Sequence, residues 1–260
     1  MSIIQGTAKA TAGDDSFYSF PIDQSLRFDG SSYLSRTVSN NNGTTYTFSV
    51  WLKRHYTTGG SVLTAGNVTS TIHYHYFGFG EVMSNIHYPD ASGGMWLNSA
   101  AEFRDSSAWY HAVWVVDCTN STTADRQKLY VNGERLTDFV TSTFAPSTSA
   151  TAGYINSTYS ENRIGRAPTG HSTYYAGYMA EINLLDGYVP TTGNSGIDSS
   201  GNLQVLGETK NGVWVPKDPS GLTYGTNGFR LTFENGIETI GGVANQIRDE
   251  SSNSNHWTKN

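Results

Sequence analysis

The sequence predicts an all-β sandwich on three observations. Apolar and polar residues alternate with a period of two in short runs, and turn residues separate these runs about every ten residues. No helical period of any length is present. The clearest run, residues 108–117 (AWYHAVWVVD), is apolar on both faces. A strand with two apolar faces is typical of a sheet that is covered on both sides.

Strands are expected in succession along the first half of the chain. Residues 1 to about 20 are mostly small and polar, and are expected to form an arm. The first strand covers residues 25–30 (SLRFDG) and is expected to continue through Tyr33 and Leu34. Residues 46–53 (YTFSVWLK) alternate, with an apolar face that starts at Tyr46 and a more polar face that holds Trp51. Further strands are expected at residues 61–65, 71–79, 95–101 and 101–103.

A tight hairpin is expected after the central run. Leu129 and Val131 alternate with Lys128 and Tyr130, and the dipeptide at residues 132–133 (NG) then tolerates the positive φ angles that a two-residue turn requires. Short strands follow at residues 162–166 and 174–186. In the latter, two alternating faces are expected: Tyr178, Ala180, Ile182 and Leu184 on one, and Met179, Glu181, Asn183 and Leu185 on the other.

The composition of the chain changes near residue 190, where Gly, Asn, Ser and Pro become frequent. Within this part, residues 212–216 (GVWVP) and 228–233 (GFRLTF) are expected to be extended, and the second run repeats the pattern of the first strand. The expected organisation is an arm at residues 1–24, a sandwich at 25–189 and an extension at 190–260. The extension would complete the sandwich or contact neighbouring subunits.

Charge and cysteine content exclude several classes of function. The net charge is -6 and no basic run is present, so nucleic acid is not an expected partner. No stretch approaches the roughly 20 apolar residues of a membrane span, and the N-terminal residues lack the pattern of a signal peptide. Cys118 is the single cysteine, so an intrachain disulfide is impossible and folding in a reducing cytosol is expected.

Five motifs in order resemble the laminin G-like branch of the concanavalin A-like lectin/glucanase superfamily. They are TFSVWLK, AWYHAVWVVD, KLYVNGERL, NRIGR and YAGYMAEINLLDG, and they fall within residues 25–189. The resemblance implies an antiparallel jelly-roll sandwich. It also implies that sugar or calcium binding is common among relatives.

A narrower resemblance covers more of the chain. SLRFDGSSYLSRT near the start, and GVWVPKDPSGLTYGTNGFRLTF with DESSNSNHW near the end, resemble structural proteins of tailed bacteriophages, especially marine ones. This resemblance implies a protein made in the bacterial cytoplasm and exposed on the virion surface. A capsid decoration protein and a tail-fibre or appendage component both fit. The implied partners are other virion proteins, further copies of the chain and host surface glycans.

Aromatic residues in the middle loops and near residue 174 are candidates for stacking on a sugar ring. They are Tyr74, Tyr76, Tyr88, Trp96, Tyr174 and Tyr175. The alternative is that these rings cover the sheets or a contact between subunits, where aromatic residues are also enriched.

The sequence supports metal ligation less strongly than it supports stacking on a sugar. Calcium requires several oxygen ligands, and the acidic candidates in or beside loops are Asp90, Asp105, Asp117, Asp125 and Glu161. These residues form no ligand pattern, and Ala180 stands where many relatives have Asp. Zinc is a further alternative, because His73 and His75 share one face of a strand and His55 or His87 could join them. His111 is expected to be a core residue that forms an inter-strand hydrogen bond.

Catalysis is not expected from the residues. Glucan-cleaving relatives carry Glu-x-Asp-x-Glu on one strand, whereas the nearest segment in this chain is residues 181–183 (EIN). No serine-hydrolase motif or phosphate-binding loop is present. The expected function is that of a non-enzymatic virion surface protein, and the alternative is a lectin-like adhesin that binds glycans with or without calcium.

Overall fold

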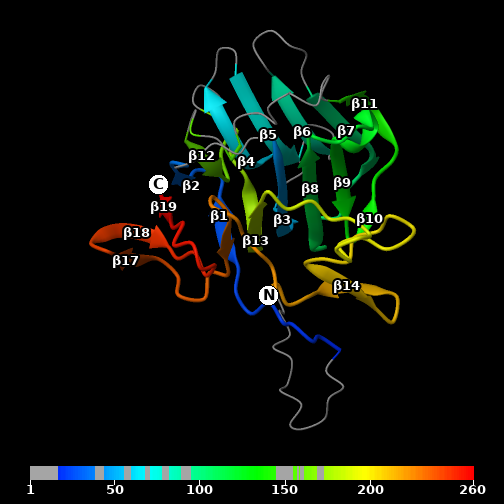
Figure 1. Cartoon of the computed structure of the whole chain (residues 1–260). Coiled ribbons are helices and arrows are strands. Elements are labelled where there is room, and N and C mark those ends of the chain that lie inside the picture. The colour runs from blue at the N-terminus through cyan, green and yellow to red at the C-terminus, as the bar shows by residue number, and fades with distance from the viewer. Residues whose placement is uncertain are drawn as a thin grey trace.

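The computed structural model shows two antiparallel β-sheets packed face to face (Figure 1). It describes residues 17–38, 44–55, 60–67, 71–77, 82–88, 95–144, 155–156, 158, 161–168 and 173–260. The predicted all-β antiparallel sandwich is confirmed. Among the described residues, no helix is long and apolar enough to span a membrane.

Sheet A contains the strand over residues 108–117 at its centre. Its described strands are, in spatial order, β1 (Leu26–Asp29), β13 (Ala176–Asp186), β3 (Thr45–Arg54), β8 (Tyr110–Asp117), β9 (Gln127–Val131) and β10 (Glu134–Arg135). Strand β16 (Phe229–Leu231) also pairs with β13. At the predicted hairpin, Asn132 and Gly133 have φ angles of 49° and 83°, which confirms the turn.

Sheet B packs against sheet A and holds the remaining strands of the sandwich. Its described strands are, in spatial order, β11 (Phe139–Thr143), β7 (Met95–Glu102), β6 (Val82–Tyr88), β5 (Thr71–Phe77), β4 (Gly60–Asn67), β12 (Asn162–Ile164), β2 (Leu34–Arg36), β19 (Trp257–Lys259), β18 (Val243–Ile247) and β17 (Glu238–Ile240). A separate hairpin joins β14 (Gly207–Lys210) to β15 (Val213–Pro216). A short 3-10 helix, η1, covers Thr123–Asp125.

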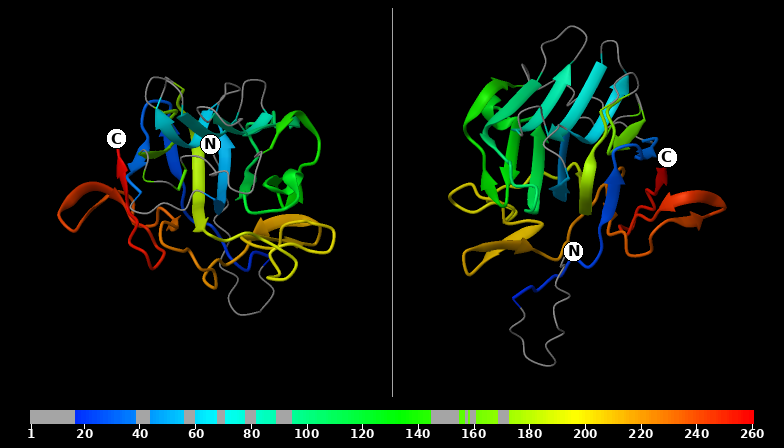
Figure 2. Two further views of the ribbon diagram at one scale, coloured as in Figure 1. Left: turned by 45° about the horizontal axis from the view of Figure 1, so that its top comes forward. Right: turned by 180° about the vertical axis from the view of Figure 1, so that it is seen from behind.

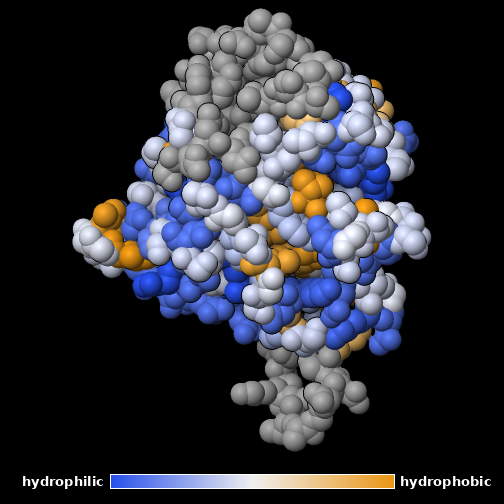
Figure 3. Space-filling view, viewed as in Figure 1, coloured by the Kyte–Doolittle hydropathy of each residue, from blue (hydrophilic) through white to orange (hydrophobic). Residues whose placement is uncertain are grey.

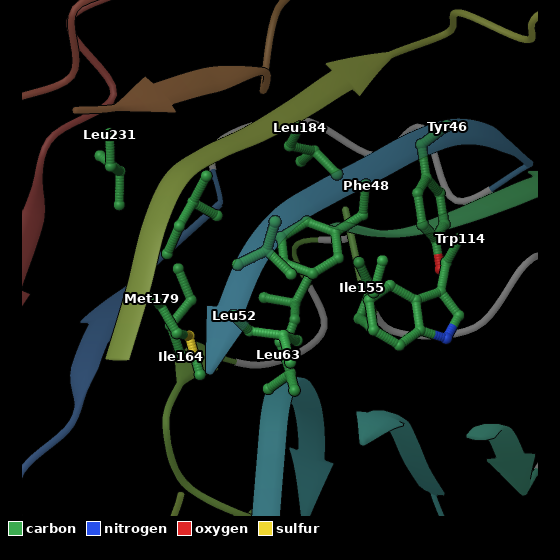
Figure 4. Close-up of a cluster of buried hydrophobic side chains, with 14 of the residues drawn as sticks. Tyr46, Phe48, Leu52, Leu63, Trp114, Ile155, Ile164, Met179, Leu184 and Leu231 are labelled. Carbon is green, nitrogen blue, oxygen red and sulfur yellow. The ribbon is translucent and has the colours of Figure 1, made fainter. Parts of the chain in front are cut away.

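The main core lies between the two sheets. Tyr46 and Phe48 from β3, Trp114 from β8, Met179 from β13 and Ile164 from sheet B all belong to this core, and each is nearly fully buried (Figure 4). The inner face of sheet A is therefore the face that holds these side chains, as the alternation in residues 46–53 predicted.

Several strand predictions differ from the structure, and two of them are instructive. Leu34 does not continue the first strand, because β2 pairs with β12 and β19 in sheet B. Strand β6 was not predicted, because the run VMSNIHY has no regular alternation. Its polar residues are buried through specific bonds: Asn85 Nδ2 donates to Gln127 Oε1 at 2.7 Å, and the carbonyl of Ser84 accepts from Trp114 Nε1.

A β-bulge in β13 changes which side chains share a face of that strand, so the predicted faces are wrong in part. The pairing with β3 shifts between Ala180 and Asn183, and Glu181 has a φ of 44°. The extra residue brings Met179 onto the core face with Ile182 and Leu184, although simple alternation had placed Met179 opposite them. Strands β1 and β16, which have similar sequences, pair with β13 on either side of this bulge.

Residues 190–260 are interleaved with the sandwich. They supply β16 to sheet A and β17 to β19 to sheet B, and the amide of Asn260 donates to the carbonyl of Tyr33. Other residues of this part pack on the outer face of sheet A, where Leu203 and Tyr224 join Val113 and Val115 in a second apolar cluster (Figure 2). The outer face is thus covered by chain segments rather than by another sheet.

Candidate functional site

A cavity of about 350 Å³ lies between the N-terminal segment and the outer face of sheet A, and we name it the aromatic pocket. One wall comes from the segment 17–25 and consists of Tyr18, Pro21, Ile22, Asp23, Gln24 and Ser25. The other wall consists of Trp51, Trp109, Ala180, Trp214 and Pro216. Its volume falls within the range of small-molecule sites.

A buried histidine supports two of the tryptophans. The ring of His111 is stacked between Trp51 and Trp214, with centroid separations of 4.7 Å and 5.9 Å. Trp214 Nε1 donates to His111 Nδ1 at 2.9 Å, so the ring proton of His111 lies on Nε2 and is donated to Ser49 Oγ at 2.7 Å. The expected inter-strand hydrogen bond of His111 is confirmed.

The imidazole of His111, which lies under the pocket, is uncharged. Burial lowers the pKa of His111 to about 3, so the imidazole is neutral at physiological pH. Both ring nitrogens already have partners, and this fixes the tautomer and the orientation of the ring. The stack is therefore a rigid neutral base for the indole of Trp214.

Two glycines make room for Trp214. A Cβ atom at Gly133 would lie 2.3 Å from the indole, and one at Gly207 would lie 2.2 Å from it. Gly133 belongs to the predicted hairpin turn, so it serves both the turn and the packing of an indole from β15. The hairpin β14–β15 is held close to sheet A by this contact.

The N-terminal wall is anchored by polar contacts. Ser19 Oγ donates to Glu208 Oε1 at 2.8 Å, which links the segment to the hairpin β14–β15. The ring of Phe20 lies 5.5 Å from the guanidinium carbon of Arg230, and Arg230 is itself paired with Glu181 at 2.6 Å. The segment 17–25 is therefore part of the pocket, although its sequence predicted only an arm.

The arrangement suits a ligand with an apolar face and polar edges. The indole rings of Trp51, Trp109 and Trp214 provide flat apolar surfaces. Asp23 and Gln24 are exposed, and neither side chain forms a hydrogen bond or ion pair with the described residues. Their oxygen and nitrogen atoms are available to the hydroxyl groups of a ligand in the pocket.

Comparison with known protein families shows which superfamily the chain belongs to. A model of the concanavalin A-like lectin/glucanases superfamily, laminin G type, matches residues 28–190, which is more than half of the chain. The chain belongs to this superfamily. The superfamily resemblance drawn from the five motifs is confirmed.

Several solved structures are similar to this chain at low sequence identity. An SAP-like pentraxin from Limulus polyphemus is 14% identical, with coverage of 74% of this chain and 94% of that chain and a TM-score of 0.40. Domains LG4-5 of the mouse laminin alpha1 chain are 12% identical, with coverage of 63% and 42% and a TM-score of 0.48. The CBM40 domain of a Ruminococcus gnavus sialidase is 13% identical, with coverage of 65% and 94% and a TM-score of 0.47. A search of curated proteins gave no match.

The glycan candidates predicted from the sequence are not among the residues that line the aromatic pocket. Tyr74, Tyr76 and Tyr88 lie on β5 and β6, and their side chains fall outside the described part of the structure. Trp96 is half-buried on β7 in sheet B. The prediction for these four residues stays a prediction.

The last two glycan candidates, Tyr174 and Tyr175, differ in how deeply they are buried. Tyr174 is half-buried, lies against Tyr33 at 6.4 Å and is 5.2 Å from the guanidinium carbon of Arg166. Tyr175 is only 1% exposed and packs edge-on against Phe28 in the main core. The prediction for Tyr175 is wrong, because its ring has no face left for a sugar.

The pocket tryptophans had a weak signal in the sequence. Trp51 lies on the more polar face of the strand over residues 46–53, where a large aromatic ring suggests that something covers the strand. Trp214 lies in an isolated extended run, GVWVP, and Trp109 just precedes the central strand. Nothing in the local patterns shows that these three distant positions meet.

The acidic candidates for calcium have local structural roles. Asp105 and Asp117 cap turns by accepting from the amides of Ser107 and Thr119, respectively. Asp125 pairs with Arg135 at 2.7 Å and Glu161 with Arg163 at 2.8 Å. Asp90 lies outside the described residues. The described residues contain no group of three acidic, histidine or cysteine side chains that could hold a metal.

The proposed zinc cluster is also corrected in part. His75 is fully buried in the main core, where its ring stacks on Phe48 and Trp114 and its Nε2 lies 3.1 Å from Tyr46 Oη. Its strand face is therefore the core face and not a polar surface. His55 is exposed at the end of β3, and the side chains of His73 and His87 lie outside the described residues.

The segment nearest to the glucanase pattern, residues 181–183, is built for packing. Glu181 is buried and paired with Arg230. Asn183 is fully buried, and its Oδ1 accepts from Tyr224 Oη at 2.7 Å. Ala180 has no polar side chain and lines the aromatic pocket. These side chains hold β13 against the outer cluster.

Proposed function

We propose that this chain is a non-catalytic carbohydrate-binding protein and that the aromatic pocket is its sugar site. The observation that carries the proposal is the meeting of Trp51, Trp109 and Trp214 in one cavity with a polar rim. A sugar ring has an apolar face of C–H groups and a polar edge of hydroxyls, and the pocket offers both kinds of surface.

The rigidity of the pocket base supports this proposal. Trp51 and Trp214 are held by the stack on His111 and by the bond from Trp214 Nε1 to His111 Nδ1. A pre-formed aromatic surface avoids the entropy cost of ordering side chains when a weakly binding ligand arrives. The membership of the chain in a superfamily that includes lectins is consistent with such a site.

The test is to screen the full chain against an array of bacterial surface polysaccharides and defined oligosaccharides. We expect Trp109→Ala to weaken binding at least about tenfold, because each 1.4 kcal/mol of lost contact lowers affinity by that factor. Trp96→Ala on sheet B is the matched control and is expected to bind as the unchanged chain does. The reverse result would place the sugar site at the residues predicted from sequence.

The same screen addresses the two alternatives. A calcium-dependent adhesin would lose binding when a chelator is present, whereas the aromatic pocket is expected to bind equally with and without it. A glycoside hydrolase would release reducing sugar from a bound polysaccharide on prolonged incubation, and we expect no release. The absence of binding to every glycan on the array would contradict the proposal.

We further propose that the protein acts on the surface of a tailed-phage virion, as a capsid decoration protein or a tail-fibre component. The resemblance of the segments near residues 25–37 and 212–233 to phage structural proteins supports this setting. The hairpin β17–β18 adds a surface for assembly, because Ile237 and Val243 are 47% and 55% exposed there (Figure 3). Other virion proteins and further copies of the chain are the proposed partners.

Immunogold labelling of intact virions tests this setting. Label over the head would indicate decoration, and label at the tail would indicate a fibre or appendage role with host glycans as targets. Virions that carry no label, and contain no peptide of this chain by mass spectrometry, would contradict the virion role. That result would leave the sugar site untouched.

A further inference from the structure

We infer that the aromatic pocket selects neutral sugars and discriminates against sugars that carry a carboxylate, such as sialic and uronic acids. The inference rests on the proposed function of the pocket as a sugar site. It adds the chemical class of the ligand, which is determined by the charges that line the cavity.

Among the lining residues that the structure describes, the charged group is one carboxylate. Among the described residues that form its walls, Asp23 is acidic and none is Lys, Arg or His. Asp23 is exposed and forms no ion pair with the described residues, so none of these neutralises its negative charge. A second carboxylate in the cavity would meet this charge without a counterion.

Three cations in the elements around the pocket are engaged in other contacts. Arg230 is paired with Glu181 at 2.6 Å, and Lys210 lies 3.4 Å from Glu208. Lys217, which follows the lining residue Pro216, donates from Nζ to the carbonyl of Gln204 at 2.9 Å. Recruiting any of these cations to an acidic sugar would break an existing contact.

The base of the pocket cannot supply a positive charge either. His111 is the titratable group beneath the tryptophans, and it is fully buried with both ring nitrogens bonded to Trp214 and Ser49. Its pKa of about 3 keeps it neutral even in mildly acidic solution. The stack therefore offers a neutral aromatic surface at neutral and mildly acidic pH.

A neutral sugar would use the same carboxylate favourably. Hydroxyl groups can donate to Asp23 Oδ atoms, and hydrogen bonds to a charged acceptor are shorter and stronger than neutral ones. A sugar carboxylate would instead lose solvation and face repulsion from Asp23. The difference in affinity between the two classes should therefore depend on the charge at residue 23.

The experiment compares matched glycans on the full chain. The probes are lactose with 3'-sialyllactose, a β-glucan with a polyglucuronate, and a galactan with a polygalacturonate, together with neutral arabinotriose. Binding is measured by isothermal titration and by quenching of tryptophan fluorescence. We expect the neutral member of a pair that binds to be favoured by about tenfold or more, as repulsion of about 1.4 kcal/mol would give.

Two variants with the same change in net charge sharpen the test. Asp23→Asn keeps a side chain that can accept hydrogen bonds but removes the negative charge, and it should reduce the preference for the neutral member about tenfold. Glu134→Gln removes an exposed carboxylate on β10 that is outside the pocket lining, and it should leave the preference unchanged.

The outcomes separate the two proposals. Preferred binding of the acidic members, or a preference that Asp23→Asn leaves unchanged, would overturn the neutral-sugar inference while a sugar site remained. Failure of every probe to bind would overturn the sugar site itself, and the inference with it.

Discussion

The two faces of sheet A each bury a histidine against aromatic rings, but they enclose it differently. On the inner face, His75 from sheet B lies against Phe48 and Trp114 in the main core. On the outer face, His111 lies between Trp51 and Trp214 under the aromatic pocket. Both rings are 0% exposed.

The difference lies in what closes each face. The inner face is closed by a whole second sheet, so its side chains exclude water along the length of the sandwich. The outer face is closed by the segment 17–25, the hairpin β14–β15 and the chain up to Tyr224, and these leave a cavity. The same kind of aromatic cluster thus fills the core on one face and lines a cavity on the other.

Substitution of one tryptophan on each face should give the largest difference between the two faces in stability and in sugar binding. Trp114 is 1% exposed and donates from Nε1 to the carbonyl of Ser84 at 3.0 Å, so Trp114→Ala should lower the free energy of unfolding by about 3–5 kcal/mol. Trp214 is half-buried, so Trp214→Ala should cost less stability but abolish sugar binding. Urea unfolding and glycan titration measure the two effects, and equal losses of binding in both folded variants would contradict the separation of the faces.

Acid should destabilise both faces through their histidines. Burial lowers the pKa of His75 and of His111 from 6.5 to about 3 in the folded protein. The unfolded chain then binds more protons than the folded chain between these values, so stability is fully present above pH 6.5 and declines as the pH falls. Each histidine should contribute a loss of about 1.4 kcal/mol per pH unit below pH 6.

Single substitutions separate the contribution of each histidine from that of the carboxylates. His75→Phe and His111→Phe should each reduce the slope of unfolding free energy against pH by about 1.4 kcal/mol per unit, measured by urea unfolding between pH 6 and pH 4. An unchanged slope in either variant would mean that the histidine is not buried in its neutral form. Glycan binding should be altered in the His111 variant alone, because its ring supports Trp214.

The strands of this sandwich were predictable where the signal is local. Residues 46–53 alternate because one face lies in the core, residues 108–117 are apolar on both faces because both are covered, and Asn132 with Gly133 form a turn through their own φ preferences. Strand β6 was missed because Ser84 and Asn85 are buried by partners on other strands. The bulge at Glu181 was missed because the ion pair with Arg230, which accompanies it, joins residues 49 positions apart.

The site was far less predictable than the fold. Trp51, Trp109 and Trp214 meet only when the chain after residue 187 folds back over the outer face of sheet A. The rings nearest in sequence, such as Tyr174 and Tyr175, were the more obvious candidates, and Tyr175 proved to be a core residue. Aromatic content indicates that a chain can bind sugars, but tertiary packing decides which rings remain accessible.

A pair of glycine substitutions tests whether the outer stack depends on its supporting turn. Gly133 and Gly212 both have positive φ angles, of 83° and 79°, so replacement by alanine should cost each about 1–2 kcal/mol of stability. A Cβ at Gly133 would meet the indole of Trp214, whereas a Cβ at Gly212 has nothing within 4 Å. Gly133→Ala should therefore lose glycan binding, and Gly212→Ala should retain it. Equal binding in the two variants would show that the position of Trp214 does not matter to the site.

The smallest expected effect concerns the anchor of the N-terminal wall. The hydrogen bond from Ser19 Oγ is the largest of the causes that lower the pKa of Glu208, and Ser19 is exposed while Glu208 is half-buried. Ser19→Ala should leave the unfolding free energy nearly unchanged, because exposed polar contacts contribute little to stability. It should raise the pKa of Glu208, as followed by NMR titration of its carboxyl carbon, and weaken glycan binding several-fold by loosening the segment 17–25. A raised pKa without any change in affinity would mean that the wall is held by the contact of Phe20 with Arg230 instead, and Phe20→Ala would then be the variant that loosens it.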